Sequence, residues 1–190
     1  METEHDFLKY IHQFIRPEDD ELHFIESLFR ERNFSKNQNI VEAGKVCSSL
    51  FFVKTGSLRS YYQTEEKEVT YWFSTEGMFA TSFYSFISRK VGFETIQCLE
   101  DSVLIEIPYD KLQEAFLQSH TLETLWRKVS ELYYVQLEER TYNFQRYDAK
   151  ERYDILLSKY PEWIFRFSLG HIASYLGISQ ETLSRIRAKK

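Results

Sequence analysis

Two hydrophobic periodicities divide the chain. From Asp6 to Arg32 apolar residues recur every three or four positions, which predicts two short helices, the second beginning at Pro17. Between Phe34 and Pro108 the spacing shortens to two, which is typical of strands with one buried face. The helical period then returns and continues through the C-terminal third.

The middle region predicts an antiparallel β-barrel or β-roll. Residues 50–63 predict two strands joined around Thr55 and Gly56. Further strands are expected over 67–73, 92–99 and 102–107, and turn residues lie at 42–45 and 100–101. Short strands at regular spacing, separated by turn signals, are characteristic of closed antiparallel folds.

Three helices are expected after this region. The first covers Tyr109–Leu117, and a long one runs from about Thr121 to Gln145. A third begins at Ala149 and ends near Tyr160 and Pro161, after a hinge at Tyr147 and Asp148. The long helix has an apolar seam that suits either pairing with a second copy or packing on its own roll: Leu122, Leu125, Trp126, Val129, Leu132, Tyr133, Gln136 and Leu137.

The last twenty-odd residues predict a helix-turn-helix. Ser168 suits the N-cap of a helix from Leu169 to about Leu176, and Gly177 supplies the positive φ of a tight turn. Ser179 suits the N-cap of a second helix that runs to about Lys189. Apolar side chains at Ile172, Leu176, Ile178, Leu183 and Ile186 would hold the two helices together.

The outward face of the second helix has the side chains that read DNA. Arg185 can pair with guanine, Gln180 with adenine, and Glu181 can accept from cytosine, with Ser184 beside them. Other residues are placed for phosphates or the start of the helix: Ser179, Thr182, Arg187, Lys189 and Lys190. The alternative is a small helical tail on a ligand-binding module, with solvated charges and protein contacts only.

These segments resemble one bacterial family. The run IASYLGISQETLSRIR is very similar to the recognition unit of the cyclic-AMP-receptor and fumarate-nitrate-regulator (CRP/FNR) transcription factors, and LFFVKTGSLR and CLEDSVLIEIP resemble their β-roll. The resemblance implies an α+β fold with a β-roll sensor domain over 1–120, a dimerisation helix over 121–146 and a helix-turn-helix over 147–190 with a truncated or absent wing. It also implies a homodimer on double-stranded DNA, with RNA polymerase and an unidentified small-molecule effector as further partners.

The family's nucleotide-binding residues are replaced in this chain. The expected Glu after Gly77 is Met78, and the expected Arg-Ser pair falls on Gly92 and Phe93, beside Glu94. A carboxylate there would repel a cyclic phosphate, so we expect no tight cyclic-AMP binding. A ligand pocket, if kept, would lie at Gly77, Met78, Phe79, Gly92, Phe93, Glu94 and Thr95, although nearby aromatic side chains are expected to fill it.

Charge and composition agree with a DNA-binding regulator. The net charge is −5, but residues 148–190 hold eight Lys or Arg against five Asp or Glu, so this tail carries +3 and the rest −8. Two cysteines, Cys47 and Cys98, are too few for an iron–sulfur sensor, and no His lies between His23 and His120. No catalytic or metal site and no cofactor is expected. The absence of a signal peptide or an apolar span predicts a cytoplasmic protein.

Overall fold

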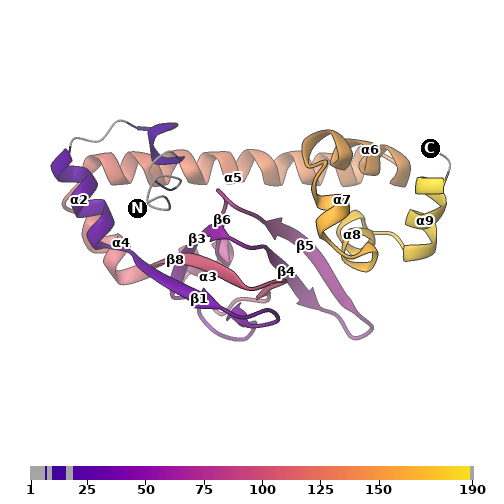
Figure 1. Ribbon diagram of the computed structural model, residues 1–190, viewed down its shortest axis with the longest axis horizontal. Coiled ribbons are helices and arrows are strands. Elements are labelled where there is room, and N and C mark those ends of the chain that lie inside the picture. Colours follow the sequence, from indigo (N-terminus) through magenta and orange to yellow (C-terminus); the bar gives the residue numbers. More distant parts are fainter. Residues whose placement is uncertain (1–6, 8–9, 16–18, 189–190) are drawn as a thin grey trace. The chain divides into compact units, whose positions relative to one another are not determined.

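The computed structural model describes residue 7, residues 10–15 and residues 19–188. The chain divides into two compact units. Unit 1 contains residues 1–60 and 73–131, and unit 2 contains residues 61–72 and 132–190. Figure 1 shows the helices and strands in chain order. The three domains expected from the sequence, with boundaries at 120 and 146, are divided differently from these compact units. Those domain boundaries stay predictions.

In the described part of the chain, eight strands form two antiparallel four-stranded sheets. The first sheet has the order β1-β8-β3-β6 and the second the order β2-β7-β4-β5. In the first sheet, β8 pairs with both β1 and β3, and Phe52 on β3 lies opposite Ile105 on β8. The strands are β1 (Arg30–Phe34), β2 (Asn39–Val41), β3 (Ser49–Thr55), β4 (Leu58–Gln63), β5 (Glu68–Ser74), β6 (Phe79–Ala80), β7 (Thr95–Cys98) and β8 (Ser102–Pro108).

Alternate residues of β3 enter two different cores. Phe51 and Val53 pack between the sheets with Leu58 of β4 and Ile96 of β7. Phe52, which points to the opposite face, packs against apolar residues of the N-terminal region and α5. The two-residue period seen in the sequence therefore reflects a first sheet that is covered on both faces.

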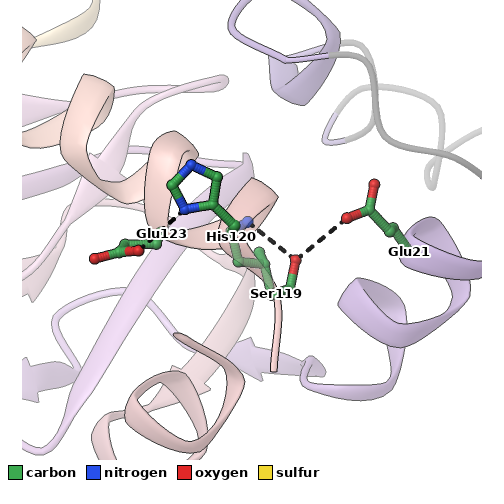
Figure 2. A network of polar contacts seen from close by, with 5 residues as sticks. Glu21, Ser119, His120 and Glu123 are labelled. Carbon is green, nitrogen blue, oxygen red and sulfur yellow. Dashed lines mark hydrogen bonds and ion pairs between the residues drawn. The ribbon is translucent and has the colours of Figure 1, made fainter. Parts of the chain in front are cut away.

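Helices of unit 1 cover the outer face of the first sheet. They are α2 (Asp19–Ser27), α4 (Tyr109–Phe116) and the first half of α5 (His120–Arg146), with α3 (Phe83–Ser88) beside the roll. Leu122, Leu125 and Val129 of α5 are buried in this core. Ser119 accepts a hydrogen bond from the N–H of Leu122 and contacts a carboxylate oxygen of Glu21 at 3.5 Å, as Figure 2 shows. This cap fixes where α5 begins.

Unit 2 contains the rest of α5 and four further helices. They are α6 (Ala149–Lys159), α7 (Trp163–Arg166), α8 (Leu169–Leu176) and α9 (Gln180–Ala188). Asp148 begins α6 with a capping box, because its carboxylate accepts from the N–H of Glu151 and the Glu151 carboxylate accepts from the N–H of Asp148. The predicted hinge at Tyr147 and Asp148 falls at the start of α6 and stays a prediction.

The fold class and most elements match the sequence analysis, with three corrections. The helical stretch expected up to Arg32 is wrong at its end, because β1 begins at Arg30 and pairs with β8. The strand expected over 92–99 begins only at Thr95. Two short helices were not predicted: α3, which lies between β6 and β7 in the chain, and α7, which follows α6. The first of the two N-terminal helices falls partly outside the described residues; within its expected range, residues 7 and 10–12 are helical.

Candidate nucleic-acid interface

Local capping signals define α8. The Ser168 hydroxyl accepts a 3.1 Å hydrogen bond from the N–H of His171, which satisfies one of the free donors in the first turn. At the other end Gly177 has φ +69°, and the N–H of Ile178 returns to the carbonyl of Ala173. This is the glycine-terminated helix end that the sequence predicted.

The second helix, α9, begins at Gln180, three residues after Gly177. The Ser179 hydroxyl accepts a 3.2 Å hydrogen bond from the N–H of Thr182 and so caps it. Leu183 is fully buried, and Ile172, Ala173 and Leu176 of α8 are buried as well. Because these side chains define the inner face, the rotation of α9 about its own axis is fixed.

The opposite face of α9 is exposed. Gln180, Glu181, Ser184, Arg185 and Arg187 are exposed, Thr182 is half-buried, and Ser179 is exposed in the preceding turn. The predicted contact residues Lys189 and Lys190 lie outside the described residues. The structure thus brings together the donors and acceptors that the sequence placed on one face, including a guanidinium, a carboxamide and a carboxylate.

Local hydrogen bonds order two of these side chains. The Arg185 guanidinium donates to the Thr182 hydroxyl at 3.2 Å. The pKa of Glu181 lies below its ordinary value, because its own backbone N–H and the Ser179 hydroxyl stabilise the carboxylate and Arg185 attracts it. Glu181 is therefore an anion at neutral pH and can act only as a hydrogen-bond acceptor.

Two arginines hold the C-terminal end of α8. Arg140 donates to the carbonyl of Tyr175, and Arg152 donates to the carbonyl of Leu176, each at 3.2 Å. Both guanidinium groups lie over the ring of Phe144, at 4.7 and 4.9 Å from its centre. Positive charge at this end of a helix is favourable, because the last carbonyls carry partial negative charge. Burial lowers the pKa of Arg140.

A serine joins α8 to the β4–β5 hairpin within unit 2. The Ser174 hydroxyl accepts a 2.8 Å hydrogen bond from the N–H of Thr70 and contacts the carbonyl of Glu68 at 3.3 Å. Neither this contact nor the two arginine caps was predicted from the sequence. The spacing of Arg140 and Phe144, four residues apart on one helix, is consistent with their contact within α5 but does not indicate a cap on α8.

The predicted pocket residues lie in unit 1, and two of the seven are buried. Glu94 and Gly92 are buried, Phe79 packs against both cores, and Thr95 accepts from the N–H of Ala43. Phe93 is exposed and contacts Tyr84. The remaining two members of this set, Gly77 and Met78, form a turn in which the Met78 sulfur lies 3.4 Å from the N–H of Thr75.

Nearby cationic and aromatic side chains are used for packing. Arg89 donates to the carbonyl of Cys47 at 2.7 Å and lies 3.7 Å above the ring of Tyr109. Phe73, Phe83 and Phe86 are buried. A groove of about 330 Å³ exists elsewhere on unit 1 and includes none of the seven predicted pocket residues; its lining includes Arg32, Asn39, Cys47, Ser49 and Glu106.

Possible metal ligands and the two cysteines are placed as follows. No group of His, Cys, Asp or Glu among residues 7, 10–15 and 19–188 is arranged to hold a metal ion. Cys47 and Cys98 are buried and free, and burial raises the pKa of the Cys98 thiol to about 11. The described helices include none with the length and apolar character of a transmembrane span.

Comparison with known proteins finds a matching domain family and similar bacterial regulatory proteins. Residues 31–119 match the cyclic nucleotide-binding domain family. The chain is 27% identical over 180 residues to the anaerobic regulatory protein of Aggregatibacter actinomycetemcomitans, covering 83% of this chain and 65% of that protein. It is 26% identical over 178 residues to the fumarate and nitrate reduction regulatory protein of Vibrio cholerae, covering 83% of this chain and 67% of that protein. The chain thus spans about two thirds of the length of these relatives.

A solved structure shares the fold. A CooA mutant from Carboxydothermus hydrogenoformans superposes with a TM-score of 0.70 at 19% identity, covering 87% of this chain and 77% of that chain. At this identity the similarity concerns the arrangement of the two sheets and the helices.

Proposed function

We propose that the chain is a homodimeric transcription regulator of the CRP/FNR family that binds specific sequences of double-stranded DNA, because it matches the cyclic nucleotide-binding domain family and is similar to bacterial regulatory proteins over most of its length. The observation that carries the proposal is the exposed row of Gln180, Glu181, Ser184 and Arg185 on α9. This row is held outward because Leu183, on the other side of the helix, is buried. Such a regulator works in the cytoplasm, where bacterial DNA lies, and RNA polymerase is its expected partner.

The residues of α9 divide between base reading and phosphate contacts. Arg185 and Gln180 can each form two hydrogen bonds with a base edge, to guanine and adenine respectively, and the Glu181 carboxylate can accept from cytosine. Thr182, Arg187 and Lys189 are proposed to contact phosphates, which position the helix without reading sequence. The basic tail supplies the attraction, and the acidic remainder makes the interaction strongly dependent on salt.

We propose that the dimer forms through α5. Residues of its first half are buried in unit 1, but Leu132 and Val135, which lie three positions apart on one face of its second half, remain exposed. A row of apolar side chains along a helix is stabilised by pairing with the same row of a second copy. Two-fold pairing would present two copies of α9 to successive major grooves, roughly 34 Å apart.

We propose that regulation does not depend on cyclic AMP. The position that should bind the ribose is Met78, and the positions that should bind the phosphate are Gly92 and Phe93. Glu94 is 1% exposed beside them, so a cyclic phosphate would enter next to a buried carboxyl group. An effector of different chemistry would have to bind without these contacts.

Selection of bound duplexes from a random pool tests the proposed function. We expect an inverted-repeat sequence to be enriched, with half-site centres separated by about one helical turn.

Sedimentation of the free protein tests the proposed dimer. The free protein should be a dimer, and Val135→Glu should dissociate this dimer and weaken operator binding. Glu131→Gln, on an exposed ion pair with Arg127, is the matched control and should do neither. Failure to enrich any sequence would contradict the proposal.

A further inference from the structure

Gly170 in the first turn of α8 is in close contact with Gln180, the first residue of α9. A Cβ atom placed on Gly170 would lie 2.5 Å from Nε2 and 3.3 Å from Cδ of Gln180. Side chains do not tolerate a contact of 2.5 Å. The carboxamide of Gln180 therefore occupies the space that a side chain at position 170 would need.

Backbone geometry does not explain a glycine at this position. Gly44, Gly56, Gly77 and Gly177 have positive φ angles, but Gly170 does not. Within a helix, glycine is also less favourable than alanine, because it has more conformational freedom to lose on folding. A side chain at position 170 would therefore have to displace the end of the Gln180 side chain from its observed place.

Gln180 is exposed, and the end of its side chain lies against Gly170. Within the part of the chain that the structure describes, its side chain takes part in no hydrogen bond. Its two N–H donors and its carbonyl acceptor are consequently available to a ligand. Reading adenine requires one donor and the acceptor to lie together in the plane of the base, so the direction of the carboxamide matters.

We propose that Gly170 is a specificity-determining position: the open space above it sets the direction in which the Gln180 carboxamide meets a base pair. The inference rests on the proposed function, in which Gln180 reads DNA. Gly170 does not itself contact a base; it is a positioning residue that acts through Gln180. A methyl group at position 170 leaves the fold intact, because the atom it displaces is the end of a flexible side chain.

A double-mutant cycle tests the proposal on the dimeric protein and its selected operator. Affinities are measured for the wild type, Gly170→Ala, Gln180→Ala and the double variant. Each is measured with the operator and with single-base-pair variants, and Gln180→Ala identifies the base pair that Gln180 reads. We expect Gly170→Ala to lower discrimination at this base pair about 5-fold, the effect of losing one hydrogen bond of a two-bond contact. In the Gln180→Ala background it should change nothing.

Thermal unfolding shows whether Gly170→Ala disturbs the fold, because a structural defect would lower the melting temperature. Gly170→Ala should leave the melting temperature unchanged or raise it, because alanine favours the helix. Unchanged discrimination in Gly170→Ala, or an effect that persists in the Gln180→Ala background, overturns the inference. If the protein selects an operator but Gln180→Ala relaxes no base pair, the inference fails while the proposed function stands. If no sequence is selected, both fail.

Discussion

Phe144 lies directly against Gly177 within unit 2. A Cβ atom on Gly177 would come within 2.8 Å of Cε1 of Phe144, and Gly177 has φ +69°. Phe144 also lies under the guanidinium groups of Arg140 and Arg152, which bind the last carbonyls of α8. The end of α8 is therefore fixed by the long helix α5 and by α6, and Gly177 is the residue that allows the aromatic ring to approach.

Gly177→Ala should lower the free energy of unfolding more than Gly44→Ala does. The left-handed conformation alone costs a residue with a Cβ about 1–2 kcal/mol. The contact with Phe144 adds an overpacking cost of about 1–3 kcal/mol. Urea unfolding followed by circular dichroism measures the loss.

Gly44→Ala is the control for this experiment. Gly44 has φ +83°, but nothing lies within 4 Å of the added Cβ. It should therefore show the conformational cost without the steric one. Equal losses for the two variants would contradict a packing role for Phe144.

Arg185→Ala and Arg187→Ala should separate base reading from phosphate contact. Arg185→Ala should cost about 1–3 kcal/mol of specific binding and relax one operator position. Arg187→Ala should weaken binding equally on all sequences and reduce its dependence on salt. Fluorescence anisotropy with the operator and a random duplex, over a range of salt concentrations, distinguishes the two. Uniform weakening by Arg185→Ala would mean that Arg185 contacts phosphate only.

Cyclic AMP should not raise the melting temperature. A ligand that binds only the folded state stabilises it, and a concentration 100 times its dissociation constant would add about 2.7 kcal/mol. With Met78, Gly92 and Phe93 in place of the family's polar residues, we expect no shift by differential scanning fluorimetry. A clear upward shift at micromolar cyclic AMP would show that another set of residues binds the nucleotide.

Glu106 should contribute stability that is lost in acid. Burial opposes its ionisation, but hydrogen bonds from Arg32 at 2.8 Å and Ser49 at 2.7 Å outweigh burial and hold the pKa of Glu106 below its ordinary value of 4.5. A carboxyl group with a lowered folded-state pKa stabilises the fold above its unfolded pKa. This contribution is lost as the pH falls through the folded value.

Glu106→Gln should therefore lower the free energy of unfolding at pH 7, and the difference from the wild type should shrink below pH 4.5. Urea titrations at several pH values measure this. Glu114→Gln, which removes an exposed ion pair with Lys111, should have little effect at any pH. A difference for Glu106→Gln that stays constant with pH would exclude the ionised carboxylate as its cause.

Local signals explain why the sequence predicted α8 and α9 well. Ser168, Gly177 and Ser179 each carry a conformational preference that acts within a few residues, and Leu183 fixes the inner face. Strand β1 shows the opposite case. Its residues Arg30–Asn33 are polar and exposed, and they form a strand because β8 pairs with them from seventy positions away. A pairing of this kind leaves no periodic pattern in the short strand itself.

The contacts around α8 and α9 could not be predicted from the sequence for a similar reason. The sequence placed Tyr133 and Leu137 in an apolar seam of α5, but it gave no sign that Arg140 would cap α8 or that Ser174 would bind β5. These contacts join residues 35 and 104 positions apart. Gly170 is similar, because its close contact with Gln180 appears only when α8 and α9 are brought together.

The hydrogen bonds of Ser174 bear on how the protein behaves at high concentration. β5 is the last strand of its sheet, and such strands offer unpaired backbone groups that can recruit a strand of another molecule. Ser174 occupies the N–H of Thr70 and contacts the carbonyl of Glu68, so part of this edge is already satisfied within the same chain. The Ser174 hydroxyl on α8 thereby reduces the number of unpaired backbone groups through which this edge could aggregate with another strand.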